Sequence, residues 1–143
     1  MKSLRNFQAL GAAVLLCTAA ASALAAGPVR GSIDGRAYQT GGVDWHSRAE
    51  MQRHAAEYDA RVSLSEGWLR RPVANAKVDI YDASGNDVFS LAQAGPRTDV
   101  MLPPGHYRVV AQAAGNAVSG RLEVKDHGVA DVHLHWRGGP MSH

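Results

Sequence analysis

From residue 61 onward, apolar and polar residues alternate in short runs, and this period of two constrains the fold more than any other feature. In "AKVDIYD", Val78 and Ile80 alternate with Lys77 and Asp79. Successive side chains of a strand point to opposite faces, so each run would bury one face. Similar runs are "RVSLS", "DVFSL", "TDVML", "HYRVVAQA", "GRLEV" and "VADVHLHW". The pattern predicts a mainly β protein, an antiparallel β-sandwich of six or seven strands.

One helix is predicted ahead of the strands, over residues 43–60, packed on the sandwich. Ser47 and Glu50 match a capping box, in which each side chain satisfies a free N–H of the first turn. The expected core face is Met51, Ala55, Tyr58 and Val62, and the expected exposed ion pairs are Arg53–Glu57 and Glu57–Arg61. The sandwich should span 61–137, with a flexible, glycine-rich lead-in at 26–42 and a disordered tail at 138–143.

The N-terminus has the pattern of a signal peptide. Lys2 and Arg5 precede an apolar run that is too short for a stable membrane anchor, and "ALA" ends at Ala25. We predict a signal peptide over 1–25, cleavage after Ala25, and a periplasmic or secreted protein with no membrane anchor. Leu16 before Cys17 does not suit lipoprotein processing.

Cleavage would change the composition that bears on function. The signal segment carries two of the 15 basic residues, which leaves 13 Lys and Arg against 13 Asp and Glu in 118 residues. A neutral chain with one basic doublet, Arg70-Arg71, lacks the charge pattern of a nucleic-acid-binding protein. Loss of Cys17 would remove the only cysteine and, with it, disulfides and thiolate metal sites.

Three stretches carry a resemblance to a known family. "PVANAKVDIYDASGND", "LPPGHYRVVAQAAG" and "GRLEVKDHGVADVHLHW" are similar to the carboxypeptidase regulatory-like domain, a transthyretin (prealbumin)-type sandwich related to the Ig-like folds. "GGVDWHSRAEM" also resembles the helical segment that precedes this sandwich in small exported proteobacterial proteins. The likeness covers about residues 41–137. It implies a sandwich in which "LPPG" forms a hairpin, and it names no ligand, because fold alone does not decide function.

Two histidines in the last run are candidate metal ligands. If "KDHGV" is a hairpin loop, His133 and His135 share the outer face with Asp131, and Glu123 lies opposite Asp131 on the preceding strand. Imidazole nitrogens and carboxylate oxygens are ligands for zinc or copper. The alternative is a solvated strand face, in which Arg121, opposite His133, relieves the repulsion between the carboxylates. No other cofactor is expected.

A second histidine group lies on the predicted helix. His46, Glu50 and His54 form one stripe, but the two histidines are nearly 12 Å apart along the axis, too far for one ion. A Glu50–His54 pair on an exposed helix face is the simpler interpretation.

No catalytic motif is present, so we expect a protein that is not an enzyme. There is neither a G-x-S-x-G nucleophile elbow nor a phosphate-binding loop. The expected role is a non-catalytic binding or accessory module of the cell envelope that contacts a protein partner. Zinc or copper binding by the surface histidines is one alternative. Carbohydrate binding through exposed Trp68 or Tyr81 is a second, which makes a glycan a possible ligand.

Overall fold

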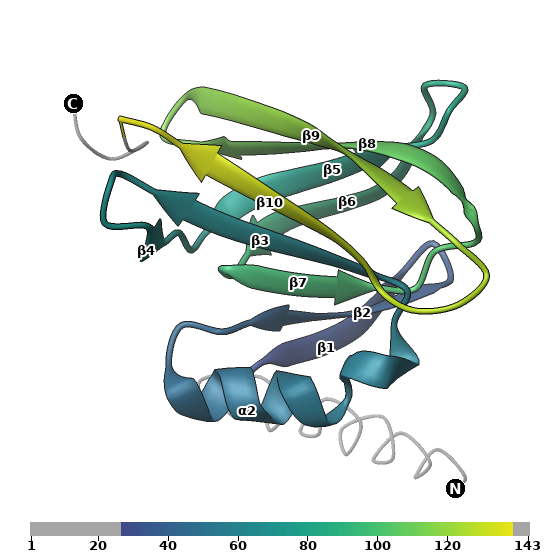
Figure 1. Ribbon diagram of the computed structural model, residues 1–143, viewed down its shortest axis with the longest axis horizontal. Helices are drawn as coiled ribbons and strands as arrows, with labels where there is room; N and C mark the ends of the chain where they lie inside the picture. Colours follow the sequence, from purple (N-terminus) through teal and green to yellow (C-terminus); the bar gives the residue numbers. More distant parts are fainter. Residues whose placement is uncertain (1–26, 139–143) are drawn as a thin grey trace, which may run out of the picture.

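Two β-sheets packed face to face form the protein in a computed structural model, which describes residues 27–138 (Figure 1). One sheet has six strands in the order β1-β2-β7-β3-β10, with β4 beside β3, and the other has four in the order β6-β5-β8-β9. The strands are β1 (Val29–Ile33), β2 (Arg36–Gly41), β3 (Ala60–Glu66), β4 (Arg71–Pro72), β5 (Ala76–Tyr81), β6 (Asp87–Ala94), β7 (Arg97–Val100), β8 (Gly105–Ala113), β9 (Asn116–Val124) and β10 (Ala130–Trp136). The mainly β sandwich with one helix confirms the predicted fold class, but ten strands are described rather than six or seven.

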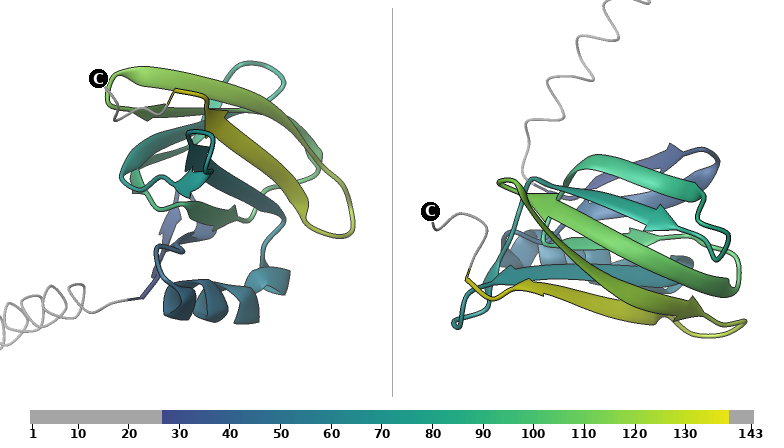
Figure 2. Two further views of the ribbon diagram at one scale, coloured as in Figure 1. Left: turned by 60° about the vertical axis from the view of Figure 1, so that its left-hand side comes forward. Right: turned by 90° about the horizontal axis from the view of Figure 1, so that it is seen from above.

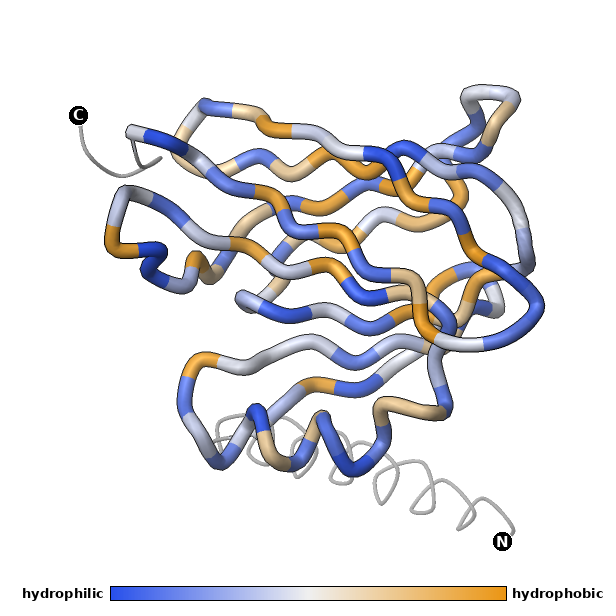
Figure 3. Tube along the Cα trace, viewed as in Figure 1, coloured by the Kyte–Doolittle hydropathy of each residue, from blue (hydrophilic) through white to orange (hydrophobic). Residues whose placement is uncertain are grey.

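Apolar side chains from the inner faces of both sheets fill the space between them. Val78 and Ile80 of β5 are fully buried, whereas Lys77 between its apolar neighbours is exposed. Figure 3 shows this alternation of apolar and polar residues along the strands. The largest fully buried side chain is Phe89 of β6, which packs edge-on against Tyr38 of β2. Burying a side chain of this size contributes about 1.5–3 kcal/mol.

The prediction of a flexible lead-in is wrong for residues 27–42. β1 and β2 form an antiparallel hairpin, and β2 continues the sheet by pairing with β7. The loop between them is Asp34-Gly35, with φ of 50° and 80°. Asp-Gly is a strong signal for a two-residue hairpin turn, because both positions need positive φ. The glycine content was therefore a turn signal, not a sign of an unstructured segment.

The helix is shorter than predicted and begins at a different cap. Helix α2 spans Trp45–Arg53, a 3-10 turn η2 follows at Ala55–Glu57, and β3 begins directly afterwards. The predicted capping box is wrong: Asp44 is the N-cap, and its Oδ1 accepts the Ser47 N–H at 2.8 Å. Ser47 Oγ instead accepts the Gly42 N–H at 2.7 Å, which ties the helix to the end of β2.

The predicted core face of this segment is confirmed, but its exposed ion pairs are not. Met51, Ala55, Tyr58 and Val62 are all buried. Side chains four residues apart are neighbours only within a continuous helix. Because α2 ends at Arg53, the side chains of Arg53, Glu57 and Arg61 do not lie on one helical face. Arg53 pairs with Glu50, Glu57 with His54 and Arg30, and Arg61 with Asp99.

The "LPPG" segment connects the two sheets and is not the hairpin that was predicted. β7 pairs with β2 and β3, whereas β8 pairs with β5 and β9. Tyr107 fixes this crossover by donating its hydroxyl to the Pro103 carbonyl at 2.6 Å. Burial raises the pKa of the Tyr107 hydroxyl, so it keeps this proton.

The last strand also has a different partner from the one predicted. β9 and β10 do not form a hairpin: β9 pairs with β8 in the four-stranded sheet, and β10 pairs in parallel with β3 in the six-stranded sheet. β9 and β10 therefore belong to opposite layers (Figures 1 and 2). They still approach closely, because a Cβ at Gly120 would lie 2.9 Å from the side chains of Val132 and Leu134.

Candidate functional site

His133 and His135 converge on one buried hydroxyl group. His133 Nε2 lies 2.7 Å and His135 Nδ1 lies 2.8 Å from the Oγ of Ser65, which is 4% exposed. The parallel register of β3 and β10 creates this arrangement by placing Ser65 directly beside His135. A serine hydroxyl carries a single proton, so it donates to one neutral imidazole and accepts from the other. Because His133 uses Nε2 and His135 uses Nδ1, two neutral rings in this arrangement hold the same tautomer, with the proton on Nδ1 of both or on Nε2 of both.

The two carboxylates predicted to join them lie elsewhere. Asp131 is on the same face of β10, but its closest cation is Arg61 of β3, at 3.9 Å. Glu123 lies on β9 in the other sheet, opposite His106 and 3.9 Å from that ring. The expected register of Glu123 opposite Asp131 is wrong, because β9 and β10 are not paired.

The predicted four-ligand set is thus reduced to the two histidines. Within residues 27–138, no group of three or more His, Cys, Asp or Glu side chains is placed to hold a metal ion. A metal held by His133 and His135 would take its other ligands from water, with Zn–N distances of about 2.0–2.1 Å.

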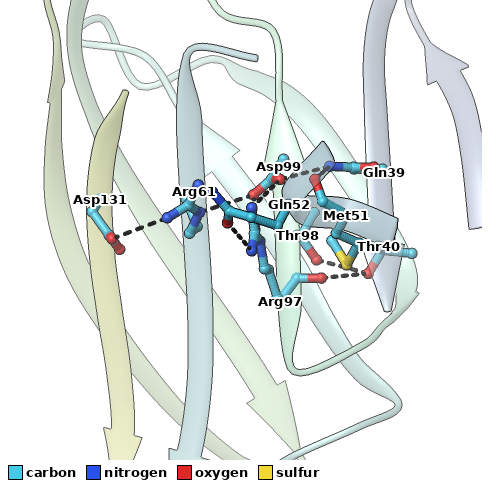
Figure 4. Close-up of polar contacts among 9 residues, drawn as sticks. All are labelled: Gln39, Thr40, Met51, Gln52, Arg61, Arg97, Thr98, Asp99 and Asp131. Carbon is cyan, nitrogen blue, oxygen red and sulfur yellow. Dashed lines mark hydrogen bonds and ion pairs between the residues drawn. The ribbon is translucent and has the colours of Figure 1, made fainter. Parts of the chain in front are cut away.

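A row of polar residues crosses the outer face of the six-stranded sheet, and its last member, Asp131, lies two residues before His133 on β10. The register aligns Gln39 of β2, Asp99 of β7, Arg61 of β3 and Asp131 of β10 (Figure 4). Asp99 is 1% exposed and accepts from Arg97 through both oxygens, at 2.9 and 3.2 Å.

Two further donors complete the contacts of Asp99. Gln39 Nε2 donates to it at 2.7 Å and also to the Met51 carbonyl of α2 at 3.0 Å, and Arg61 Nε donates at 3.3 Å. Arg97 also donates to Gln52 of α2 at 3.1 Å. This network, which sequence reasoning missed, fixes α2 on the sheet.

The histidine stripe of the helix is divided into two separate contacts. His54 Nε2 lies 3.5 Å from Glu50, which confirms the predicted pair, and its Nδ1 lies 2.8 Å from Glu57. The hydrogen bond from His54 lowers the pKa of the Glu57 carboxyl. His46 instead stacks on Trp45 with ring centroids 3.8 Å apart. The stripe therefore forms surface ion pairs and one aromatic stack.

The two aromatic candidates for sugar binding have different surroundings. Trp68, in the turn between β3 and β4, is 89% exposed. Tyr81 ends β5, and the Arg108 guanidinium lies 4.7 Å from its ring centroid. Of these two candidates, only Trp68 presents an open aromatic surface.

Comparisons with known proteins add no functional assignment. A scan against models of protein families gives no match, and a search of curated proteins gives no similar sequence. Across residues 27–138, no helix is long and apolar enough to cross a membrane. The predicted signal peptide and the end of the predicted tail, from residue 139, lie outside the described residues.

Proposed function

We propose that this protein is a non-catalytic binding module of the cell envelope that contacts a protein partner through the tip between β3 and β4. The tip is residues 68–71, Trp-Leu-Arg-Arg, the last of which is the first residue of β4. The observation that carries the proposal is the exposure of Trp68 (89%) and Leu69 (59%) beside each other in a tight turn. Exposed apolar groups of this kind mark interaction sites, and Trp and Arg dominate binding energy at interfaces.

Backbone hydrogen bonds hold the turn that carries these side chains. The Gly67 N–H donates to the Trp136 carbonyl at 2.8 Å, which ties the base of the tip to the end of β10. The Arg70 N–H donates back to the Gly67 carbonyl at 3.1 Å. A preformed turn loses little conformational entropy on binding.

The charges around the tip define the chemistry of the partner. Arg70, Arg71 and Arg137 are exposed, and none forms an ion pair with another residue of the 27–138 region. The fitting partner is a protein with an apolar pocket for Trp68 and carboxylates at its rim. The envelope location rests on the N-terminal sequence pattern described above.

Site-specific photo-crosslinking in cells of the source organism tests this proposal. We expect a benzoylphenylalanine placed at Trp68 to give one discrete protein adduct, and the same group at exposed Ala83, in the β5–β6 turn, to give none. Arg70→Glu with Arg71→Glu should remove the adduct. Equal adducts at both positions, or an adduct that persists in the charge-reversed variant, would refute the proposal.

Zinc or copper binding by His133 and His135 is a second candidate, favoured by the convergence of their nitrogens on Ser65 Oγ. Calorimetric titration of untagged protein with zinc and with copper(II) should give one saturable site. His133→Ala with His135→Ala should abolish the site, whereas His106→Ala with His127→Ala should not. An unchanged site in the first pair of substitutions would end this candidate.

The remaining alternative, carbohydrate binding, would use the same tip. The fluorescence of Trp68 should then shift with a soluble glycan, and Trp68→Ala should remove the shift.

The burial of Ser65 supports the non-catalytic proposal. If Ser65 acted as a nucleophile beside His133 and His135, a substrate would need to reach its hydroxyl, which belongs to a residue that is 4% exposed.

A further inference from the structure

A cavity of about 610 Å³ lies on the four-stranded sheet, at the end of the sheet where the β5–β6 turn meets β8 and β9. Its lining includes Tyr81, Asp82, His106, Arg108, Arg121 and Glu123. Among the described elements, α2 packs on the other sheet and leaves this face open (Figures 1 and 2). The volume is in the range of small-molecule sites, roughly 300–1,000 Å³.

Two like charges face each other inside this cavity. The antiparallel register places Arg108 of β8 directly opposite Arg121 of β9. Like charges directly opposite on neighbouring strands destabilise a sheet. Neither guanidinium forms an ion pair within 4.0 Å with any carboxylate in the described part of the chain. Arg108 and Arg121 are therefore an electrostatically unfavourable pair in the lining of this cavity.

The two carboxylates in the cavity wall are engaged by other groups. Asp82 Oδ1 accepts the N–H groups of Ser84 at 3.0 Å and Asn86 at 2.9 Å, which closes the β5–β6 turn. Hydrogen bonds from the Asn86 backbone lower the pKa of Asp82. Glu123 lies 3.9 Å from the His106 ring. Both carboxylates keep their charge, but neither lies within 4.0 Å of the Arg108 or Arg121 guanidinium, so the two arginines have no direct counter-ion in the cavity.

The Arg108 side chain is held in place before any ligand arrives. Its guanidinium lies over the Tyr81 ring at 4.7 Å from the centroid. Stacking on an aromatic ring leaves the edge of the planar guanidinium free to donate hydrogen bonds. Opposed guanidiniums can each present paired N–H donors to one oxoanion.

We propose that this cavity binds a small organic anion, whose carboxylate or phosphate group lies between Arg108 and Arg121. The shared chemistry is an oxoanion that accepts hydrogen bonds from both guanidiniums, and the remaining volume accommodates a group the size of a sugar ring. The site belongs to the opposite sheet from the tip, so it does not depend on the proposed protein contact.

Thermal unfolding at constant ionic strength tests the proposal with two probes, inorganic phosphate and galacturonate, against a chloride reference. We expect at least one probe to raise the Tm of the wild-type protein in a saturable way. Arg121→Gln should weaken the apparent affinity at least tenfold. In chloride alone, the same variant should melt at or above the wild-type temperature, because the repulsion is gone. Arg53→Gln, which removes one exposed positive charge from α2 on the other sheet, should keep the wild-type response.

The outcomes separate the ligand classes and can overturn the site. A response to phosphate alone identifies a phosphorylated ligand, a response to galacturonate alone identifies a carboxylate, and both responses support the shared oxoanion. Arg121→Lys keeps the charge but not the paired donors, so its affinity should be intermediate. Equal responses of wild type and Arg121→Gln, or no response beyond chloride in wild type, would refute the proposal.

Discussion

Replacing Asp99 by Asn should be among the most destabilising conservative changes on the outer face of the six-stranded sheet. The carboxylate is 1% exposed and receives four hydrogen bonds, two of them from Arg97. An amide of the same shape removes the charge and turns one acceptor into a donor that faces other donors. The Arg97 and Arg61 side chains, 15% and 23% exposed, then lose their shared counter-ion.

The expected loss is about 3–5 kcal/mol, because removing one partner leaves a buried charge uncompensated. Domains of this size have total stabilities of about 5–15 kcal/mol. With a urea slope of about 1–3 kcal/mol per M, the unfolding midpoint should fall by at least about 1 M. Because Gln39 and Arg97 also bind α2, proteolysis within residues 45–57 should become faster.

Asp131→Asn is the matched control for this measurement. Asp131 ends the same row, but its side chain is 57% exposed and its single ion pair spans 3.9 Å. Exposed pairs contribute about 0–1 kcal/mol, so this variant should unfold almost as the wild type does. If Asp99→Asn lost less than about 1 kcal/mol with an unchanged slope, the assignment of Asp99 as the centre of a buried ion network would be wrong.

Three further variants probe the other sheet and the contact between the layers. Burial and the neighbouring Asp79 carboxylate raise the pKa of Asp87, so stability is lost as the pH rises through that raised pKa. Asp87→Asn should therefore raise the Tm at neutral pH and have no effect below the ordinary aspartate pKa of about 3.9. An equal effect of the substitution at both pH values would contradict this cause. Gly120→Val should destabilise by about 1–3 kcal/mol in urea unfolding, because even a Cβ there would lie 2.9 Å from Leu134, and a neutral result would mean that β9 and β10 are less tightly packed. Phe89→Ala should lose about 3–5 kcal/mol in the same assay, since the ring is 1% exposed, and a loss below about 1 kcal/mol would place this ring outside the core.

Local patterns in the sequence predicted the local elements well. Alternation identified β3 and the strands from β5 onward, but not the short β4, since the period of two depends only on neighbouring residues. The buried face around Met51 and Tyr58 was also predicted, although Tyr58 lies beyond the end of the helix. The hairpin at Asp34-Gly35 was missed despite its turn signal, because the abundance of glycine was taken to indicate flexibility.

Pairing between distant strands was not predictable from these patterns. Adjacent strands are often hairpin partners, so β9 and β10 were expected to pair, whereas each has a partner in a different sheet. The error placed Glu123 beside Asp131 and concealed the contact of both histidines with Ser65. The outward direction of His133 was nevertheless correct, because alternation fixes the face of a strand whichever partner it has.

The parallel pairing of β10 with β3 has a consequence for how the chain assembles. Ser65 and His135 are separated by 70 residues, and every pair in this ladder has the same separation. Loop closure over such a distance precedes any gain from the contact, so topologies of this kind fold slowly, on the scale of milliseconds to seconds. Until the last strand arrives, one edge of β3 presents unpaired backbone groups to any other extended chain. Nearly the whole polypeptide must therefore be available before that edge is closed.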